Sequence, residues 1–230
     1  FSFIMIKAVI FDLDNTLLDF ISMKESAVSS AVQAMIEAGL DLDEKSSYER
    51  IITLYQETGW ENQQIFDIFL KEKTGEVDNK YLAAAIVSYR RAREATLRLY
   101  PDVQRTLNVL AKMGLKLAVV SDAPSREAWM RIYYLNLHHV FDLVLTFDDV
   151  GERKPSPKGF EMALEKLGIK TDEALMIGDW PERDVAGASK LGIKTIYAKY
   201  GDTFGTVESG ADWDVENIYE VVGIIKSLND

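Results

Sequence analysis

Residues 6–17, IKAVIFDLDNTL, decide the fold because they join a buried strand to two acidic side chains. The apolar run of residues 6–11 ends directly at Asp12, and Asp14 follows one residue later. Such a strand places both carboxylates at the carboxyl edge of a sheet, where open α/β folds bind their ligands. Side chains alternate along a strand, so Asp12 and Asp14 begin on the same side of the chain. Two acids held together repel each other, which favours a retained proton or a cation between them.

Composition and charge narrow the class of protein. The chain has 230 residues, of which 47% are hydrophobic and 27% charged, as is ordinary for a soluble globular protein. The formal net charge is −11 and the basic runs do not exceed Arg90-Arg91, so we expect no nucleic-acid partner. An acidic protein that handles an anionic substrate needs local positive charge from a metal or from placed lysines.

The residue types that are missing exclude several kinds of site. Without cysteine there is no disulfide, thiolate nucleophile or zinc–sulfur centre. The apolar stretches fall short of the roughly 20 residues that a membrane helix needs. The apolar start, residues 1–11, resembles a buried strand more than a secretory leader. We therefore expect a cytoplasmic protein without a membrane partner, either a monomer or a small homo-oligomer.

The order of apolar segments predicts a parallel sheet. Five nearly continuous apolar runs are typical of strands buried on both faces: residues 6–11, 115–120, 143–147, 174–177 and 194–198. Helical patterns lie between the later runs, at residues 103–113, 125–135, 157–167 and 185–191. This alternation predicts a Rossmann-like, doubly wound α/β core. Right-handed crossovers place the carboxyl ends of all its strands on one edge.

The segment of residues 19–97 interrupts that alternation. It contains four helical patterns, at residues 24–38, 48–57, 62–73 and 78–93, and no convincing strand. A helical insertion of this length forms a small bundle of its own. We therefore predict a core of residues 1–18 and 98–230 and an all-helical domain of residues 19–97.

Polar residues suited to phosphate chemistry follow successive strands. They are Asp12 and Asp14 after the first strand, Ser121 after the second, Lys154 in GERKPSP after the third, and Asp179 and Asp184 in GDWPERD after the fourth. Taken singly, each has an ordinary structural interpretation as a helix cap, a turn or a solvated loop charge. Their joint occurrence, in this order, favours a functional interpretation. Four carboxylates with only Lys154 opposing them also require a cation before an anionic phosphate can bind, and all-oxygen ligation suits Mg²⁺.

These segments resemble the four motifs of the haloacid dehalogenase-like hydrolase superfamily. DLDNT at residues 12–16 resembles the first motif, Ser121 the second, Lys154 the third, and GDWPERD at residues 178–184 the fourth. The helical insertion is similar to the cap domain that this family carries between its first and second motifs. The resemblance covers essentially the whole chain. It implies a phosphoric monoester hydrolase, because Asp-x-Asp in the first motif usually marks phosphatases and related phosphotransferases.

The resemblance also implies roles for the residues. Asp12 would be the nucleophile that forms an aspartyl-phosphate, and Asp14 the general acid and then the general base. Ser121 with its backbone N–H, and Asp122 beside it, would bind the phosphoryl group, and Lys154 would neutralise the developing charge. The Mg²⁺ ligands would be Asp12, the backbone carbonyl of Asp14, and Asp179. Asp184 would act through water or orient Lys154.

Two positions depart from the commonest family pattern. Asn15 stands where glycine is frequent, and asparagine tolerates unusual backbone angles nearly as well. Asp122 stands where a neutral asparagine is common, and we expect its carboxylate to cap the helix that begins at Pro124–Ser125.

Other candidates have weaker support. His138 and His139 are expected to pack or to lie on the surface. Arg90, Arg91 and Arg93 are expected on a solvated helix face, although one of them could reach an anionic substrate. Trp60, in a loop between two helices of the insertion, is either a packing residue or a specificity residue.

The sequence thus predicts a Mg²⁺-dependent phosphatase that hydrolyses small phosphorylated metabolites. Three alternatives stay open at this point: a phosphomutase, a dehalogenase, and a binding protein that keeps the fold without turnover. Asp14 argues against the dehalogenase, since the dehalogenases of this family lack the second acid. Mn²⁺ and Co²⁺ remain alternatives to Mg²⁺.

Overall fold

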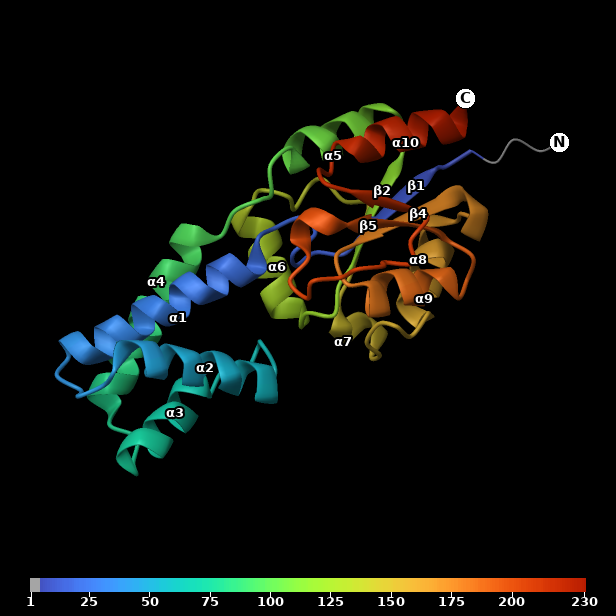
Figure 1. Ribbon diagram of the computed structural model, residues 1–230. Coiled ribbons are helices and arrows are strands. Elements are labelled where there is room, and N and C mark those ends of the chain that lie inside the picture. Colours follow the sequence, from blue (N-terminus) through green and yellow to red (C-terminus); the bar gives the residue numbers. More distant parts are fainter. Residues whose placement is uncertain (1–4) are drawn as a thin grey trace. The chain divides into compact units, whose positions relative to one another are not determined.

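Strand β1 (Ala8–Phe11) lies in the middle of a parallel sheet in the computed structural model, which describes residues 5–230 (Figure 1). The chain forms two compact units. The sheet unit contains the chain up to Asp19 together with Arg98–Asp230, and the helical unit is Phe20–Leu97. The expected α/β sheet with an inserted all-helical segment is confirmed. The first four residues of the apolar start lie outside the described part.

Among residues 5–230, the sheet has six parallel strands in the order β3-β2-β1-β4-β5-β6. The other five strands are β2 (Lys116–Val120), β3 (Leu143–Leu145), β4 (Ala174–Gly178), β5 (Lys194–Ala198) and β6 (Trp213–Val215). Each of the five predicted strands is present. β3 ends two residues earlier than expected, because Thr146 and Asp149 form a capping box that starts the next helix.

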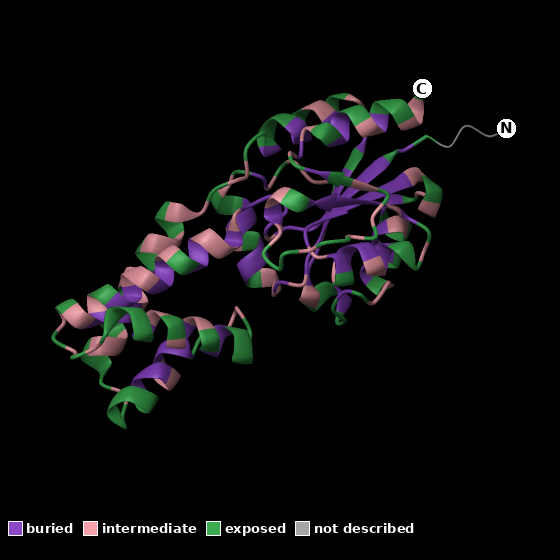
Figure 2. Ribbon diagram, in the orientation of Figure 1, coloured by how far each residue is buried: buried purple, intermediate pink, exposed green. Residues whose placement is uncertain are grey.

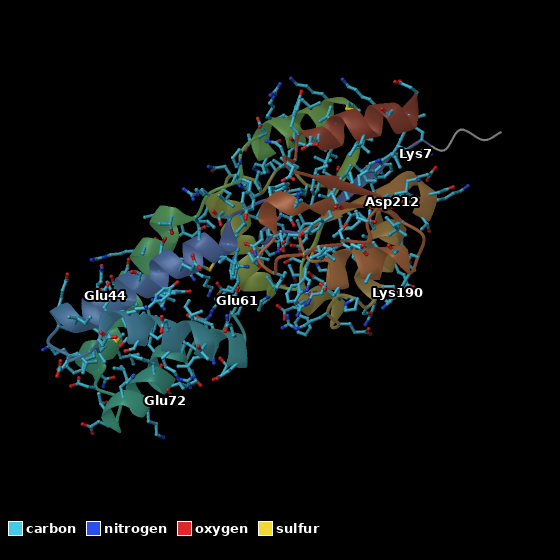
Figure 3. The ribbon with its side chains drawn as sticks, in the orientation of Figure 1. Lys7, Glu44, Glu61, Glu72, Lys190 and Asp212 are labelled. Atoms are coloured by element: carbon cyan, nitrogen blue, oxygen red, sulfur yellow. The ribbon has the colours of Figure 1, made fainter. Side chains whose placement is uncertain are left out.

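Strand β6 was not predicted, because three residues are too few for a periodic pattern. The loop before it is tied to the neighbouring strand through Asp212, which Figure 3 labels. The Asp212 carboxylate accepts a hydrogen bond from the backbone N–H of Thr195, at 2.7 Å. This contact places β6 beside β5 at the edge of the sheet.

Helices cover both faces of the sheet. They are α5 (Val103–Lys112), α6 (Ser125–Tyr134), α7 (Phe147–Val150), α8 (Lys158–Leu167), α9 (Ala186–Ser189) and α10 (Glu220–Asn229). Within this unit, α5 and α10 lie together over one face, and α8 and α9 lie over the other (Figure 1). The strands between them are the most completely buried part of the unit (Figure 2), and every residue of β1 is fully buried. The predicted helix of residues 185–191 is instead a π-helical turn, Pro181–Val185, followed by the short α9.

The helical unit consists of α1 (Phe20–Glu37), α2 (Glu44–Thr58), α3 (Ile65–Thr74) and α4 (Asn79–Thr96). All four predicted helices are present, with α1, α2 and α4 longer than expected. The side chains of Asp43 and Asp78 accept hydrogen bonds from the backbone at the starts of α2 and α4. The unit has its own apolar core, which includes Ile51 and Phe69.

The two passages between the units lie side by side in the sheet unit. Leu18 and Leu99 form an antiparallel bridge. The N–H of Asp19 donates to the carbonyl of Arg98 at 3.1 Å, and that of Tyr100 donates to the carbonyl of Leu17 at 3.0 Å. The chain therefore leaves and re-enters the sheet unit at neighbouring points.

Candidate active site

The site lies at the carboxyl edge of the sheet, where the central strands end. Asp12 follows β1, Ser121 follows β2 and Asp179 follows β4, as the parallel register requires. The N–H of Asp12 donates to the carbonyl of Ile177 at 2.9 Å, which fixes the end of β1 against β4. The structure thus brings together side chains that are more than 160 residues apart in the sequence.

Lys154 is the centre of this group. Its Nζ donates to Oδ1 of Asp12 at 2.5 Å and to Oδ1 of Asp184 at 2.6 Å. A third hydrogen bond, of 3.1 Å, goes to the carbonyl of Val120. Because an ammonium has three donors, these partners account for all of them. The residue is only 6% exposed, so its charge and its direction are both fixed inside the protein.

Three carboxylates surround this lysine. Asp12, Asp179 and Asp184 are buried, and one oxygen of each lies within 4.8 Å of the other two. Burial raises the pKa of Asp12 to about 7, although Lys154 opposes the shift and Asp184 adds to it. Burial and the charge of Asp12 likewise raise the pKa of Asp179. One lysine does not balance three carboxylates, so the group could hold a metal ion.

Burial disfavours the charge on Lys154, but the carboxylates outweigh it. The attraction of Asp12, Asp184 and Asp122 raises the pKa of Lys154 above its usual value. The lysine therefore stays an ammonium at neutral pH.

Asp184 reaches Lys154 from the π-helical turn. Its Oδ2 accepts a hydrogen bond from the N–H of Trp180 at 3.0 Å, while Oδ1 holds the lysine. This packing requires Gly178, because a Cβ there would lie 2.3 Å from the Asp184 carboxyl carbon. Of the two roles expected for Asp184, orienting Lys154 is the one that requires this hydrogen bond.

Asp179 is positioned by residues to which the sequence analysis gave no role. The hydroxyl of buried Thr16 donates to Oδ1 of Asp179 at 3.0 Å. The hydroxyl of Tyr200 donates to the carbonyl of Thr16 at 2.7 Å, and Gly201 packs against the same loop. A Cβ at Gly201 would lie 1.7 Å from the carbonyl oxygen of Asn15. The detectable signal was a glycine just after a buried strand, where a close backbone approach is common.

Asp14 has a partner that the sequence analysis did not identify. Its Oδ2 accepts a hydrogen bond of 2.6 Å from Nη1 of Arg131, on α6. Asn15 follows with a φ of 59°, in the left-handed region that the sequence analysis expected asparagine to tolerate.

Ser121 lies buried at the end of β2, but its N–H is not the expected phosphate donor. That N–H donates to the carbonyl of Leu145 at 2.9 Å as part of the sheet. The Ser121 hydroxyl accepts a hydrogen bond from the N–H of Ala123 at 3.1 Å. Only the hydroxyl therefore fits the role expected for this residue.

The prediction that Asp122 caps the following helix is wrong. The N–H of Ser125 donates instead to the carboxylate of Asp148 at 2.6 Å, because α7 reaches the start of α6. Asp122 accepts from the N–H of Lys154 at 3.0 Å and from Arg183 at 3.2 Å. It anchors the loop that carries Lys154, and Arg183 balances its charge.

The weaker candidates have contacts within their own units. His138 stacks on Tyr133, with ring centroids 4.4 Å apart, as expected for a packing residue. Trp60 stacks on Tyr55 at 5.8 Å within the helical unit. Arg90 and Arg93 line a cavity of about 60 Å³ in the same unit. Among residues 5–230, every helix is too short or too polar to cross a bilayer.

Comparison with known proteins defines the class. The model of the haloacid dehalogenase-like hydrolase family matches residues 6–192. The chain therefore belongs to the haloacid dehalogenase-like hydrolases, and the resemblance seen in its four motifs is confirmed.

The relatives narrow the comparison within that family. A glyceraldehyde 3-phosphate phosphatase of Methanopyrus kandleri is 35% identical and aligns over 97% of this chain and 99% of its own length. One from Methanocaldococcus jannaschii is 33% identical over the same shares. The crystal structure of a phosphatase of this family from Thermococcus onnurineus is 26% identical, with a TM-score of 0.72 over 98% of this chain and 100% of the other. The expected enzyme class, a phosphoric monoester hydrolase, agrees with these relatives.

Proposed function

We propose that this chain is a Mg²⁺-dependent phosphatase that hydrolyses small phosphorylated metabolites through an aspartyl-phosphate. One observation carries the proposal: buried Lys154 is held between Asp12 and Asp184, beside the third carboxylate of Asp179. A fixed cation next to a carboxylate at a strand end provides the positioning and charge neutralisation on which phosphoryl transfer depends.

Asp12 is the nucleophile of the first step. Its carboxylate oxygen attacks phosphorus, the bond from phosphorus to the ester oxygen breaks, and Asp14 gives that oxygen a proton. In the second step Asp14 takes a proton from water, whose oxygen attacks the aspartyl-phosphate and releases inorganic phosphate. Lys154 compensates the charge on the phosphoryl oxygens, and the hydroxyl of Ser121 donates to one of them.

The carboxylates of Asp12 and Asp179 and the backbone carbonyl of Asp14 would hold Mg²⁺. These oxygen donors are the ligands that Mg²⁺ prefers. The ion would supply Lewis-acid stabilisation of the phosphoryl oxygens. Thr16 supports this set of ligands, because its hydroxyl fixes one oxygen of Asp179.

The substrate that the relatives favour is a triose phosphate, since the matched phosphatases of two archaea are named for glyceraldehyde 3-phosphate. The helical unit then acts as a cap that selects the substrate, and Trp60 and Arg90 are its candidate specificity residues.

The test is phosphate release from p-nitrophenyl phosphate and from glyceraldehyde 3-phosphate, in Mg²⁺ and in EDTA. We expect turnover only with the metal. Asp12→Asn should lower turnover by about 10⁴-fold or more while the protein keeps its melting temperature, because the change is nearly isosteric and removes the nucleophile. Asp172→Asn, at an exposed position, is the matched control and should retain full activity. Phosphate release by the Asp12 variant at the parent rate would show that the nucleophile is another residue.

A further inference from the structure

Arg131 lies inside the protein although it carries a charge. Its side chain is 7% exposed, on α6, and its Nη1 donates to Oδ2 of Asp14 at 2.6 Å. The Asp14 side chain is 23% exposed, so the pair lies at the border between the interior and the site. The two residues are 117 positions apart in the sequence.

Stability alone is a poor explanation for this ion pair. Removing a guanidinium from water costs free energy, and apolar residues of similar volume often stabilise a protein as well as a buried ion pair does. The same helix contains a contrasting pair, Arg126 with Glu127 at 3.1 Å, in which the arginine side chain is 72% exposed. Of these two arginines, Arg131 is the one that contacts Asp14 of the proposed active site.

Asp14 lies outside the group of three carboxylates that meets at Lys154. Asp12, Asp179 and Asp184 form one group around Lys154, whereas Asp14 is not a member of that group among the described residues. Its backbone is also restrained, because the N–H of the next residue, Asn15, donates to the carbonyl of Leu18 at 2.8 Å. Backbone and carboxylate are thus both held in place.

We infer that Arg131 is a positioning residue that orients the carboxylate of Asp14 toward the leaving oxygen of the substrate. This inference rests on the proposed function, in which Asp14 exchanges a proton with that oxygen. A misplacement of about 1 Å in a reacting group can cost two orders of magnitude in rate. The planar guanidinium suits this task because it fixes direction as well as charge.

The leaving group distinguishes positioning from a general structural effect. p-Nitrophenolate departs without a proton, whereas the alkoxide of glyceraldehyde 3-phosphate needs one. The value of kcat/KM reports only the steps up to the departure of the leaving group. Arg131→Met should therefore lower kcat/KM for glyceraldehyde 3-phosphate about tenfold more than for p-nitrophenyl phosphate.

Three further variants sharpen the test. Asp14→Asn should show the same selectivity more strongly, and adding Arg131→Met to it should cause no further loss. Arg131→Lys should recover part of the selective loss. Arg126→Met, on the same helix, should leave the ratio of the two kcat/KM values unchanged. If Arg131→Met does not fold, as judged by its thermal melt, the Lys variant and Arg131→Gln provide the same comparison.

The possible results distinguish a failure of the role inferred for Arg131 from a failure of the proposed phosphatase function. Equal losses for both substrates, or an additive loss in the Asp14→Asn background, would overturn the role of Arg131 while leaving the phosphatase intact. If Asp14→Asn itself were unselective, the acid would be misassigned and the inference would fall with it. Absence of hydrolysis by the parent protein would overturn the proposed function and the inference together.

Discussion

Each unit of the molecule contains a buried lysine, and the two lysines have opposite surroundings. Lys154 in the sheet unit is held by the carboxylates of Asp12 and Asp184. Lys24 in the helical unit is 4% exposed and donates to the carbonyl of Trp60 at 2.5 Å and to the hydroxyl of Tyr89 at 2.7 Å. Its ammonium also lies 4.6 Å from the centre of the Tyr55 ring.

The difference lies in what the partners can do. Neutral carbonyl and hydroxyl groups accept hydrogen bonds from the ammonium of Lys24, and an aromatic ring lies beside it, at a cavity that Arg90 and Arg93 also line. The carboxylates around Lys154 form a site with excess negative charge, which favours the binding of a second cation. Burial of a lysine is therefore no mark of a catalytic site by itself, whereas burial among several acids is.

Replacing Lys154 should have the largest effect. Lys154→Met removes the ammonium that lies between Asp12 and Asp184 and leaves the two carboxylates to repel each other. We expect kcat to fall by about 10³-fold or more at saturating Mg²⁺, since the fixed charge opposite the phosphoryl oxygens is lost. Steady-state kinetics with p-nitrophenyl phosphate measure this, and a variant that keeps a tenth of the parent activity would contradict the role of Lys154.

A glycine comparison comes next. Gly201→Ala places a methyl group against the carbonyl of Asn15 and should destabilise the protein by about 3 kcal/mol, with a matching loss of activity. In the helical unit, Gly75 has a φ of 85° and open space around it, so Gly75→Ala should cost only about 1 kcal/mol. Urea unfolding measures both.

Gly223→Ala on α10 is the control, because nothing lies within 4 Å of the added atom. In a helix interior, alanine is better than glycine by up to about 1 kcal/mol, so this variant should be slightly more stable. A Gly201 variant as stable as the control would show that the close approach to Asn15 relaxes without cost.

The support of the metal ligand should give a moderate effect. Thr16→Val removes the hydrogen bond to Asp179. The Mg²⁺ concentration that gives half-maximal activity should rise about tenfold, while kcat at saturating metal changes little. The control is Thr106→Val, because the hydroxyl of Thr106 is buried on α5 and has no hydrogen-bond partner within the described part of the chain. If the Thr16 variant needs the same Mg²⁺ concentration as the parent protein, this hydroxyl does not support metal binding.

The smallest effect is expected at the other lysine. Lys24→Met exchanges a buried ammonium for an apolar chain that packs well against aromatic rings. The released cost of burying a charge offsets the two lost hydrogen bonds, so unfolding free energy should change by no more than about 1 kcal/mol. If urea unfolding showed that Lys24→Met lowers the unfolding free energy by 3 kcal/mol, the proposed difference between the two lysines would be wrong.

The parallel sheet explains how much of the site was predictable. Asp12, Lys154, Asp179 and Asp184 follow successive buried runs, and the ends of parallel strands share one edge, so their meeting could be inferred without coordinates. The four helices of the insertion were predictable for a similar reason, since each has an apolar face of helical period.

The errors concern contacts that no local pattern encodes. The N–H of Ser121 belongs to the ladder with β3, and Asp148 of α7 takes the capping role expected of Asp122. Arg131 contacts Asp14 across 117 positions of the sequence, whereas an arginine on an amphipathic helix is normally expected to be solvated. Tertiary packing, not propensity, decides these positions.

The pairing of residues 17–19 with residues 98–100 has a consequence for how this protein can vary. Backbone hydrogen bonds hold the start and the end of the insertion together. For the sheet unit, the insertion is therefore a loop whose two ends are already joined. The entropy of closing a loop grows only with the logarithm of its length. A shorter, longer or differently folded insertion therefore changes little in the free energy of the sheet, and substrate preference can diverge while the chemistry at the strand ends stays the same.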